Sequence, residues 1–235
     1  MRTFVSMLIL LTIPIVSLAQ TKMNDDRKNE AIQLMRTTPE QVLQASKRLA
    51  EIVRDQDFGV RCQAAFTAVR LGQRFAEKIR SPELEKSLTE MISREVETKK
   101  TALSMVAEIT EGRGAIWTVK STFPTVIGDM DIKEGEQRKK ALFMGPCLYS
   151  GIQALGEIRA SSKEAFDLLK RLIGAQDKEV RSVAAYAMAT LDCPTGEKLK
   201  VLQERQKLEQ DQEVKDYIQG SISVLVPSQK PSRKD

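Results

Sequence analysis

The chain of 235 residues contains no histidine. This absence excludes Ser-His-Asp and Cys-His catalysis, zinc sites built on imidazole, and pH switches that depend on histidine. Aromatic residues make up only 5%, whereas helix-favouring residues such as Ala, Leu, Glu, Lys and Arg are frequent. The composition therefore predicts an all-α protein whose chemistry does not rely on imidazole.

Motifs for phosphate and metal binding are also missing. The chain has no Gly-x-x-x-x-Gly-Lys loop, and Asp129 and Asp131 are not followed by the further ligands of an EF-hand. The formal charge is +5, but no run of Lys and Arg is interleaved with aromatic residues, so nucleic acid binding is not expected. The sequence predicts no catalytic, cofactor-binding or metal-binding residue, and the protein is not expected to be an enzyme.

Only three cysteines are present, Cys62, Cys147 and Cys193, and none forms a Cys-x-x-Cys pair. In the tandem arrangement derived below, Cys62 and Cys147 lie two repeats apart. Helix layers are spaced about 8–10 Å apart, whereas the Cα atoms of bonded cysteines lie within about 7 Å. We therefore expect three unpaired thiols, with Cys62 and Cys147 acting as small core residues.

Residues 1–19 have the pattern of a signal peptide. Arg2 precedes an apolar run over residues 4–16, and the small Ser17 and Ala19 predict cleavage before Gln20. The run is shorter than the roughly 20 residues of a membrane span. We expect export to a periplasm or secretion. The alternative is an uncleaved anchor that tethers the same domain to a membrane, and only then is a membrane partner expected.

The stretch over residues 177–191 predicts one helix of a repeat. Its apolar residues recur at three- and four-residue steps and fall on one helix face: Val180, Val183, Ala184, Ala187, Met188 and Leu191. Related stretches predict about four to five helix pairs: 38–52 with 60–71, 81–93 with 102–109, an irregular segment with 144–155, 162–173 with 177–191, and 195–208 with 214–225. Val180 and Val214 are 34 residues apart, a period typical of an α-solenoid.

Acidic and basic residues four apart mark the start of three second helices: Asp57 with Arg61, Asp177 with Arg181, and Asp211 with Lys215. The aspartates are predicted to cap the helices, and the basic side chains to bridge to the neighbouring unit. In the alternative interpretation, a partner-binding surface is formed by Arg61, Arg70, Arg181, Lys215 and Trp117, and its arginines and lysine hold an acidic partner.

The Asp-x-x-Val-Arg-x-x-Ala-Ala pattern of residues 177–185, with weaker copies at 57–65 and 211–219, resembles HEAT repeats, including the HEAT-like units of phycobilisome lyases. The resemblance covers residues 38–226. It implies an α-solenoid and a scaffold for protein partners.

The remaining segments depart from the repeat. Residues 20–37 are predicted to be a polar lead-in with a short helix over 30–35. Residues 111–136 contain Trp117, the single tryptophan, and are predicted to be either a functional insertion or a divergent repeat that fills the core. Residues 227–235 are predicted to be a disordered tail.

The predicted function is that of an exported, non-catalytic scaffold or adaptor that binds another protein and needs no cofactor. A cofactor-handling or lyase-like HEAT protein and a structural envelope subunit are the alternatives.

Overall fold

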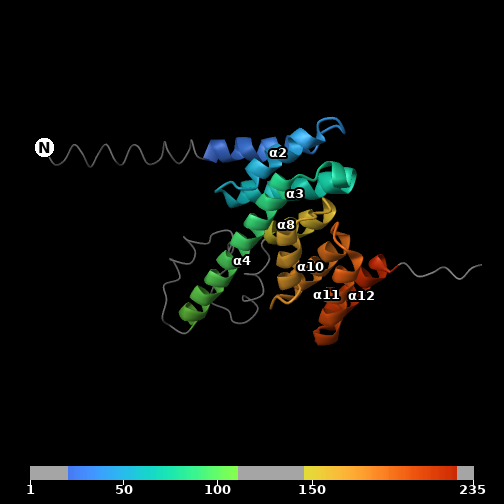
Figure 1. Cartoon of the computed structure of the whole chain (residues 1–235). Coiled ribbons are helices and arrows are strands. Elements are labelled where there is room, and N and C mark those ends of the chain that lie inside the picture. The colour runs from blue at the N-terminus through green and yellow to red at the C-terminus, as the bar shows by residue number, and fades with distance from the viewer. Residues whose placement is uncertain (1–20, 111–145, 227–235) are drawn as a thin grey trace, which may run out of the picture.

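The computed structural model describes residues 21–110 and 146–226, and within these ranges the backbone forms helices and no strands (Figure 1). The predicted all-α class is therefore confirmed. The predicted signal peptide over 1–19, the segment over 111–136 with Trp117, and the tail over 227–235 lie outside the described residues. No helix within the described ranges has both the length and the apolar character needed to cross a membrane.

The helices pack in two layers, as in a helical repeat. The first layer contains α2 (Val42–Ile52), α4 (Pro82–Thr110), α9 (Lys163–Leu172) and α11 (Thr195–Leu208). The second layer contains α3 (Phe58–Phe75), α8 (Pro146–Glu157), α10 (Lys178–Thr190) and α12 (Gln212–Leu225), and a 3-10 helix, η1 (Ala76–Lys78), follows α3. In the second layer α8 contacts both α3 and α10, and α10 contacts α12, so neighbours in space follow the chain order (Figure 1).

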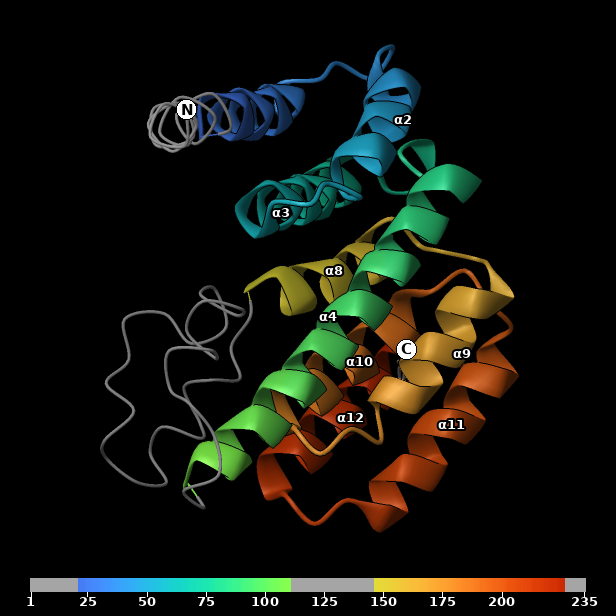
Figure 2. The same cartoon turned by 90° about the vertical axis from the view of Figure 1, so that its left-hand side faces the viewer.

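Helix α4 differs from the prediction. The sequence suggested two helices over 81–93 and 102–109, but residues 82–110 form one continuous helix that crosses one side of the stack (Figure 2). No glycine or proline lies between residues 94 and 101, so nothing there ends the helix. Helix α4 packs against α8, and the predicted second and third pairs are therefore a single pair. Among the described residues the helices form four pairs.

This pairing changes the position of α8 in the repeat. Because α3 contacts α8 directly, Cys62 and Cys147 belong to adjacent units, and the expectation that they lie two repeats apart is wrong. The pattern of burial aligns the buried Cys147 with Val60 and Val180. The repeat register predicted for residues 144–155, which makes Leu155 the equivalent of Leu191, is accordingly shifted by three residues. Ile158 is the equivalent of Leu191 instead.

The lead-in to the first pair is more helical than predicted. Residues 21–34 form a helix that covers α3 on the side away from α8 (Figure 1). Its side chains contact the turn before α3, since Asn24 Nδ2 donates to Asp57 at 2.9 Å and Arg27 pairs with Asp55. Thr67 Oγ1 of α3 donates to the Ala31 carbonyl at 3.1 Å. Helix α2 begins at Val42 instead of next to Thr38, because residues 39–41 form a turn.

Small residues allow the second-layer helices to approach closely. A Cβ atom added at Gly72 in α3 would lie 2.7 Å from the Glu157 Cβ of α8. One added at Gly156 would lie 2.8 Å from the Ala187 Cα of α10. Both distances are shorter than real Cβ contacts, so glycine is required at these two positions for the observed helix separation.

We expect Gly72→Ala to lower the free energy of unfolding by about 1–3 kcal/mol, because the added methyl group pushes α3 away from α8. Gly220→Ala in α12 is the matched control, since nothing lies within 4 Å of its added Cβ. That change should raise stability by about 0.5–1 kcal/mol through a more restricted unfolded chain. Urea unfolding followed by circular dichroism measures both, and equal effects would contradict the close approach.

Candidate functional site

Three aspartates begin second-layer helices in the same way. Asp57, Asp177 and Asp211 have extended backbone angles, and each carboxylate accepts a hydrogen bond from a backbone N–H in the first turn of α3, α10 or α12. These N–H groups have no acceptor inside the helix, so the carboxylates satisfy them and favour the positive end of the helix dipole. The aspartates therefore fix where each second helix begins.

Arg61 connects two units. Its Nη1 donates to the carbonyl oxygens of Asp55 and Gln56 at 3.0 and 2.7 Å, in the turn before its own helix. Its Nε and Nη2 donate to Glu95 Oε1 of α4 at 3.1 and 2.7 Å. The Arg61 residue is 7% exposed and Glu95 is 6% exposed. We call this arrangement, an arginine that joins its own turn to an acid of the next unit, an arginine bridge.

Arg181 forms a second arginine bridge. Its Nη1 donates to the carbonyl oxygens of Ala175 and Gln176 at 2.9 and 2.8 Å. Its Nε and Nη2 donate to the two carboxylate oxygens of Glu209, at 2.7 and 3.0 Å. Glu209 lies at the end of α11 and is 2% exposed. The same position in two units therefore makes the same set of bonds.

Glu209 carries its charge in a buried place. Burial alone would raise the pKa of this carboxyl group, but hydrogen bonds from Arg205, Arg181 and the Asp211 backbone N–H outweigh that effect and lower its pKa from 4.5 to about 2. Glu209 is therefore ionised over the whole range in which proteins are usually handled, and it is a structural charge.

The predicted partner-binding residues are placed very differently from one another. Arg61 and Arg181 are buried in arginine bridges and are not available to an acidic partner, so the partner-binding interpretation is wrong for these two. Lys215 occupies the equivalent position in α12, where the described residues include no later helix to supply an acid, and it is half-buried. Arg70 is exposed on α3, with its guanidinium carbon 5.2 Å from the centre of the Phe66 ring. Trp117 lies outside the described residues.

The side of the molecule formed by the exposed side chains of α3, α8, α10 and α12 is called the second-helix face. On this face the Glu157 carboxylate of α8 connects α3, α8 and α10. Glu157 Oε1 accepts hydrogen bonds from Gln73 of α3 at 3.3 Å, from Gln153 at 3.4 Å and from the Tyr186 hydroxyl of α10 at 3.1 Å. All three donors are neutral, and Glu157 makes no ion pair with any other residue that the structure describes.

An open groove of about 820 Å³ continues this face between α10 and α12. Its lining includes Tyr186, Tyr217 and Val224, which are 42%, 54% and 67% exposed. Two carboxylates, Glu213 and Asp216, also line it. Lys178 pairs with Glu213 at 2.7 Å, whereas Asp216 accepts only from the neutral Gln212, at 2.8 Å, within the described ranges. The groove is thus apolar with an acidic rim.

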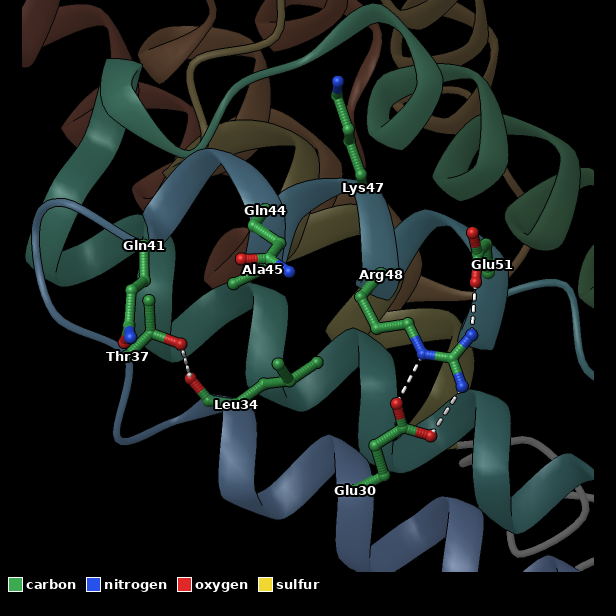
Figure 3. A pocket seen from close by; sticks show the side chains of 9 residues that line it. All are labelled: Glu30, Leu34, Thr37, Gln41, Gln44, Ala45, Lys47, Arg48 and Glu51. Atoms are coloured by element: carbon green, nitrogen blue, oxygen red, sulfur yellow. Dashed lines mark hydrogen bonds and ion pairs between the residues drawn. The ribbon is translucent and has the colours of Figure 1, made fainter.

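A second hollow, of about 520 Å³, lies between the helix over 21–34 and α2 (Figure 3). Arg48 reaches between Glu30 and Glu51 in it, and the Lys47 side chain points away (Figure 3). The hydrogen bond from Arg48 lowers the pKa of Glu30. The Arg48 guanidinium is already paired with two carboxylates. It is therefore less available to a ligand than the exposed side chains of the groove are.

A third hollow, of about 540 Å³, is lined by Glu85 of α4 and the start of α9. Glu85 is 4% exposed and accepts hydrogen bonds from the backbone N–H groups of Ser161 and Ser162, at 3.1 and 2.9 Å. This carboxylate joins two units as the arginine bridges do. No three metal-ligating side chains come together in the described part of the chain.

No family model matches the chain, and no curated protein matches it. Among solved structures the chain is similar to an engineered protein whose crystal structure comes from the Northeast Structural Genomics Consortium, with 14% identity and a TM-score of 0.34. The match covers 88% of this chain and 93% of that chain. A likeness at this level supports no argument about fold or function.

Sequence reasoning missed the residues that complete these arrangements. Glu95 and Glu209 lie 34 and 28 residues after their arginines, in different first-layer helices, and share no local motif. Glu157 was missed because its neighbours come from three helices. The sequence did contain a signal for the exposed aromatic residues. Phe66 and Tyr186 are large side chains among alanines, and each lies six residues after the valine that begins its stretch, Val60 or Val180.

We expect Arg181→Met and Glu209→Gln each to lower the free energy of unfolding by about 3 kcal/mol. Arg181→Met leaves the buried Glu209 with Arg205 as its remaining cation, and Glu209→Gln leaves the buried Arg181 guanidinium without its acid. The double variant Arg181→Met/Glu209→Met should lose less than the two single changes together, since no charge of this pair then remains. Lys178→Gln breaks the exposed pair with Glu213 and should leave the urea midpoint unchanged. Additive losses in the double variant would contradict the bridge.

The pH dependence of stability should report Glu209. Its pKa in the folded protein, about 2, is below the ordinary 4.5, so its contribution is complete above 4.5 and is lost as the pH falls toward 2. The difference in unfolding free energy between the wild type and Glu209→Gln should therefore shrink over this range as Glu209 becomes neutral. Urea titrations at several pH values measure it, and a constant difference would show that Glu209 does not titrate as described.

Proposed function

We propose that the chain is a HEAT-like solenoid that is exported and acts, without catalysis, as a scaffold or adaptor that binds another protein through the second-helix face. The tandem helix pairs and their Asp-x-x-Val-Arg starts support the HEAT-like assignment. The signal-peptide pattern over residues 1–19 supports export.

The observation that carries the proposal is the row of exposed aromatic and apolar side chains at the groove. Tyr186, Tyr217 and Val224 come from two helices and meet at one groove, although the core of the stack is complete without them. Tyrosine is enriched at the energetic centres of protein interfaces, because it supplies a large apolar area and a polar hydroxyl with little loss of side-chain entropy. The groove therefore has the side chains of an interface.

The charges indicate which kind of partner fits. Glu157 lies where α3, α8 and α10 meet and Asp216 lines the groove, and neither forms an ion pair with a cation of the described residues. Of the predicted arginines, Arg61 and Arg181 are buried, whereas Arg70 is exposed on α3. The proposed partner is thus a protein segment with apolar side chains beside lysine or arginine, placed so that its cations reach Glu157 or Asp216.

The test is affinity capture from the native compartment with the wild type and with Tyr186→Ser/Tyr217→Ser. We expect a protein enriched by the wild type to fall roughly tenfold or more with the double variant, since truncating central aromatic residues removes much of the binding energy. Asp216→Asn should weaken capture of the same protein and reduce its dependence on salt.

Leu43→Ser is the matched control, because Leu43 is 53% exposed on α2, in the other layer. It should retain the captured protein, and all variants should keep the urea midpoint of the wild type. Equal capture by the groove and control variants would contradict binding through this face. Self-association as the only interaction would favour a structural subunit instead.

A further inference from the structure

The two cysteines that the sequence separated are neighbours in the fold. Cys62 lies on α3 and Cys147 at the start of α8, and these two helices pack against each other. Gly72 and Glu157 follow the two cysteines by ten residues each and are in contact across the same two helices, so Cys62 and Cys147 face the same helix contact. The structure holds both as free thiols. The influence of each thiol on the pKa of the other agrees with this placement. On its other side Cys147 Sγ lies 3.6 Å from Met91 Sδ of α4. The pair thus lies where three helices of two units meet.

We infer that Cys62 and Cys147 are oxidised to an intramolecular disulfide that cross-links α3 to α8. The oxidant is an external disulfide, either a small molecule such as oxidised glutathione or a protein disulfide. The Cys62 thiolate attacks one sulfur and releases a thiol, and the Cys147 thiolate then attacks Cys62 sulfur in the mixed disulfide and releases the second thiol. Two cysteine thiols are oxidised, one external disulfide is reduced, and the two protons pass to the released thiolates.

Exposure and ionisation give the order of the steps. Cys147 is fully buried, whereas Cys62 is partly exposed, so an external disulfide reaches Cys62 first. The neighbouring Cys147 thiol lowers the pKa of Cys62, while the Cys62 thiol and burial raise the pKa of Cys147. Cys62 is accordingly the attacking thiol and Cys147 the resolving one.

Cys193 provides an internal comparison. It follows α10 and is partly buried, and burial is the main reason that its pKa is raised. The other influences on it are Lys198 and carboxylates, and none is a thiol of the described residues. Oxidation should therefore select two of the three cysteines. The signal-peptide pattern adds that an exported chain reaches compartments in which disulfides persist.

The cross-link would close a loop that contains α4 and residues 111–145. A loop of this length strongly restricts the unfolded chain in the simple model and therefore favours the folded state. For a protein of this size this stabilisation corresponds to a rise in Tm of roughly 10 °C. The first two units would then separate less readily than the later ones, which have no such pair among the described residues.

The test uses the purified chain, fully reduced, then incubated with oxidised glutathione and quenched with acid. We expect one free thiol to remain of the three, a mass lower by two hydrogens, and a non-reduced peptide map that links the Cys62 and Cys147 peptides. The oxidised chain should melt roughly 10 °C above the reduced one. Three remaining thiols, or a stable glutathione adduct on Cys62, would overturn the inference.

Three variants keep the outcome clear. Cys193→Ser should leave no free thiol after oxidation and keep the difference in Tm. Cys62→Ser should abolish both the cross-link and the difference in Tm. Cys147→Ala should do the same, and because alanine is apolar it suits this buried site if serine does not. A link to Cys193 in any map would also contradict the assigned pair.

Discussion

The fold depends on the contact between consecutive second-layer helices. A single helix pair cannot bury its own apolar stripe, so each unit needs the next one along the row from α3 through α8 and α10 to α12. The separation of these helices is set by glycine and alanine at the crossing points, where Gly72 and Gly156 leave no room for a Cβ atom. Everything exposed on the second-helix face is held in place by this row of close contacts.

Charge is used inside the stack as well as on its surface. Arg61 and Arg181 look like surface residues in the sequence, yet each is buried and ties its own turn to an acid of the next unit. Because these two cations are buried, they are not available at the second-helix face, where Glu157 and Asp216 make no ion pair with a described residue. The same arginines therefore stabilise the repeat and place two positive charges inside it instead of on the surface that a partner would meet.

The sequence predicts most accurately the helices that carry local markers. Asp177 and Ser162 define the starts of α10 and α9, and their positions agree with the structure. The sequence predicted two helices where α4 is one, because the repeat period of two helices per unit was applied to a stretch that has no helix-breaking residue. Helix α8 was misaligned because Leu148 stands where other units have arginine or lysine, so the marker is missing. Residues such as Glu209 and Glu157 act through neighbours distant in sequence, and no local pattern indicates them.

The unit formed by α4 and α8 departs most from the repeat, and its contact with α3 is where Cys62 and Cys147 lie. Once α4 is a single helix, residues 111–145 separate the two helices of one pair, and Cys147 is the second residue of α8, where the described chain resumes. Because α8 lacks the arginine of its equivalents, it has no arginine bridge of its own to the next unit. Its start is held instead by the contact of Cys147 Sγ with Met91 Sδ of α4 and by packing against α3, on which Cys62 lies. A covalent bond between Cys62 and Cys147 would therefore add to the Arg61–Glu95 bridge between the first two units, and it would not replace the bridge that α8 lacks toward the following unit.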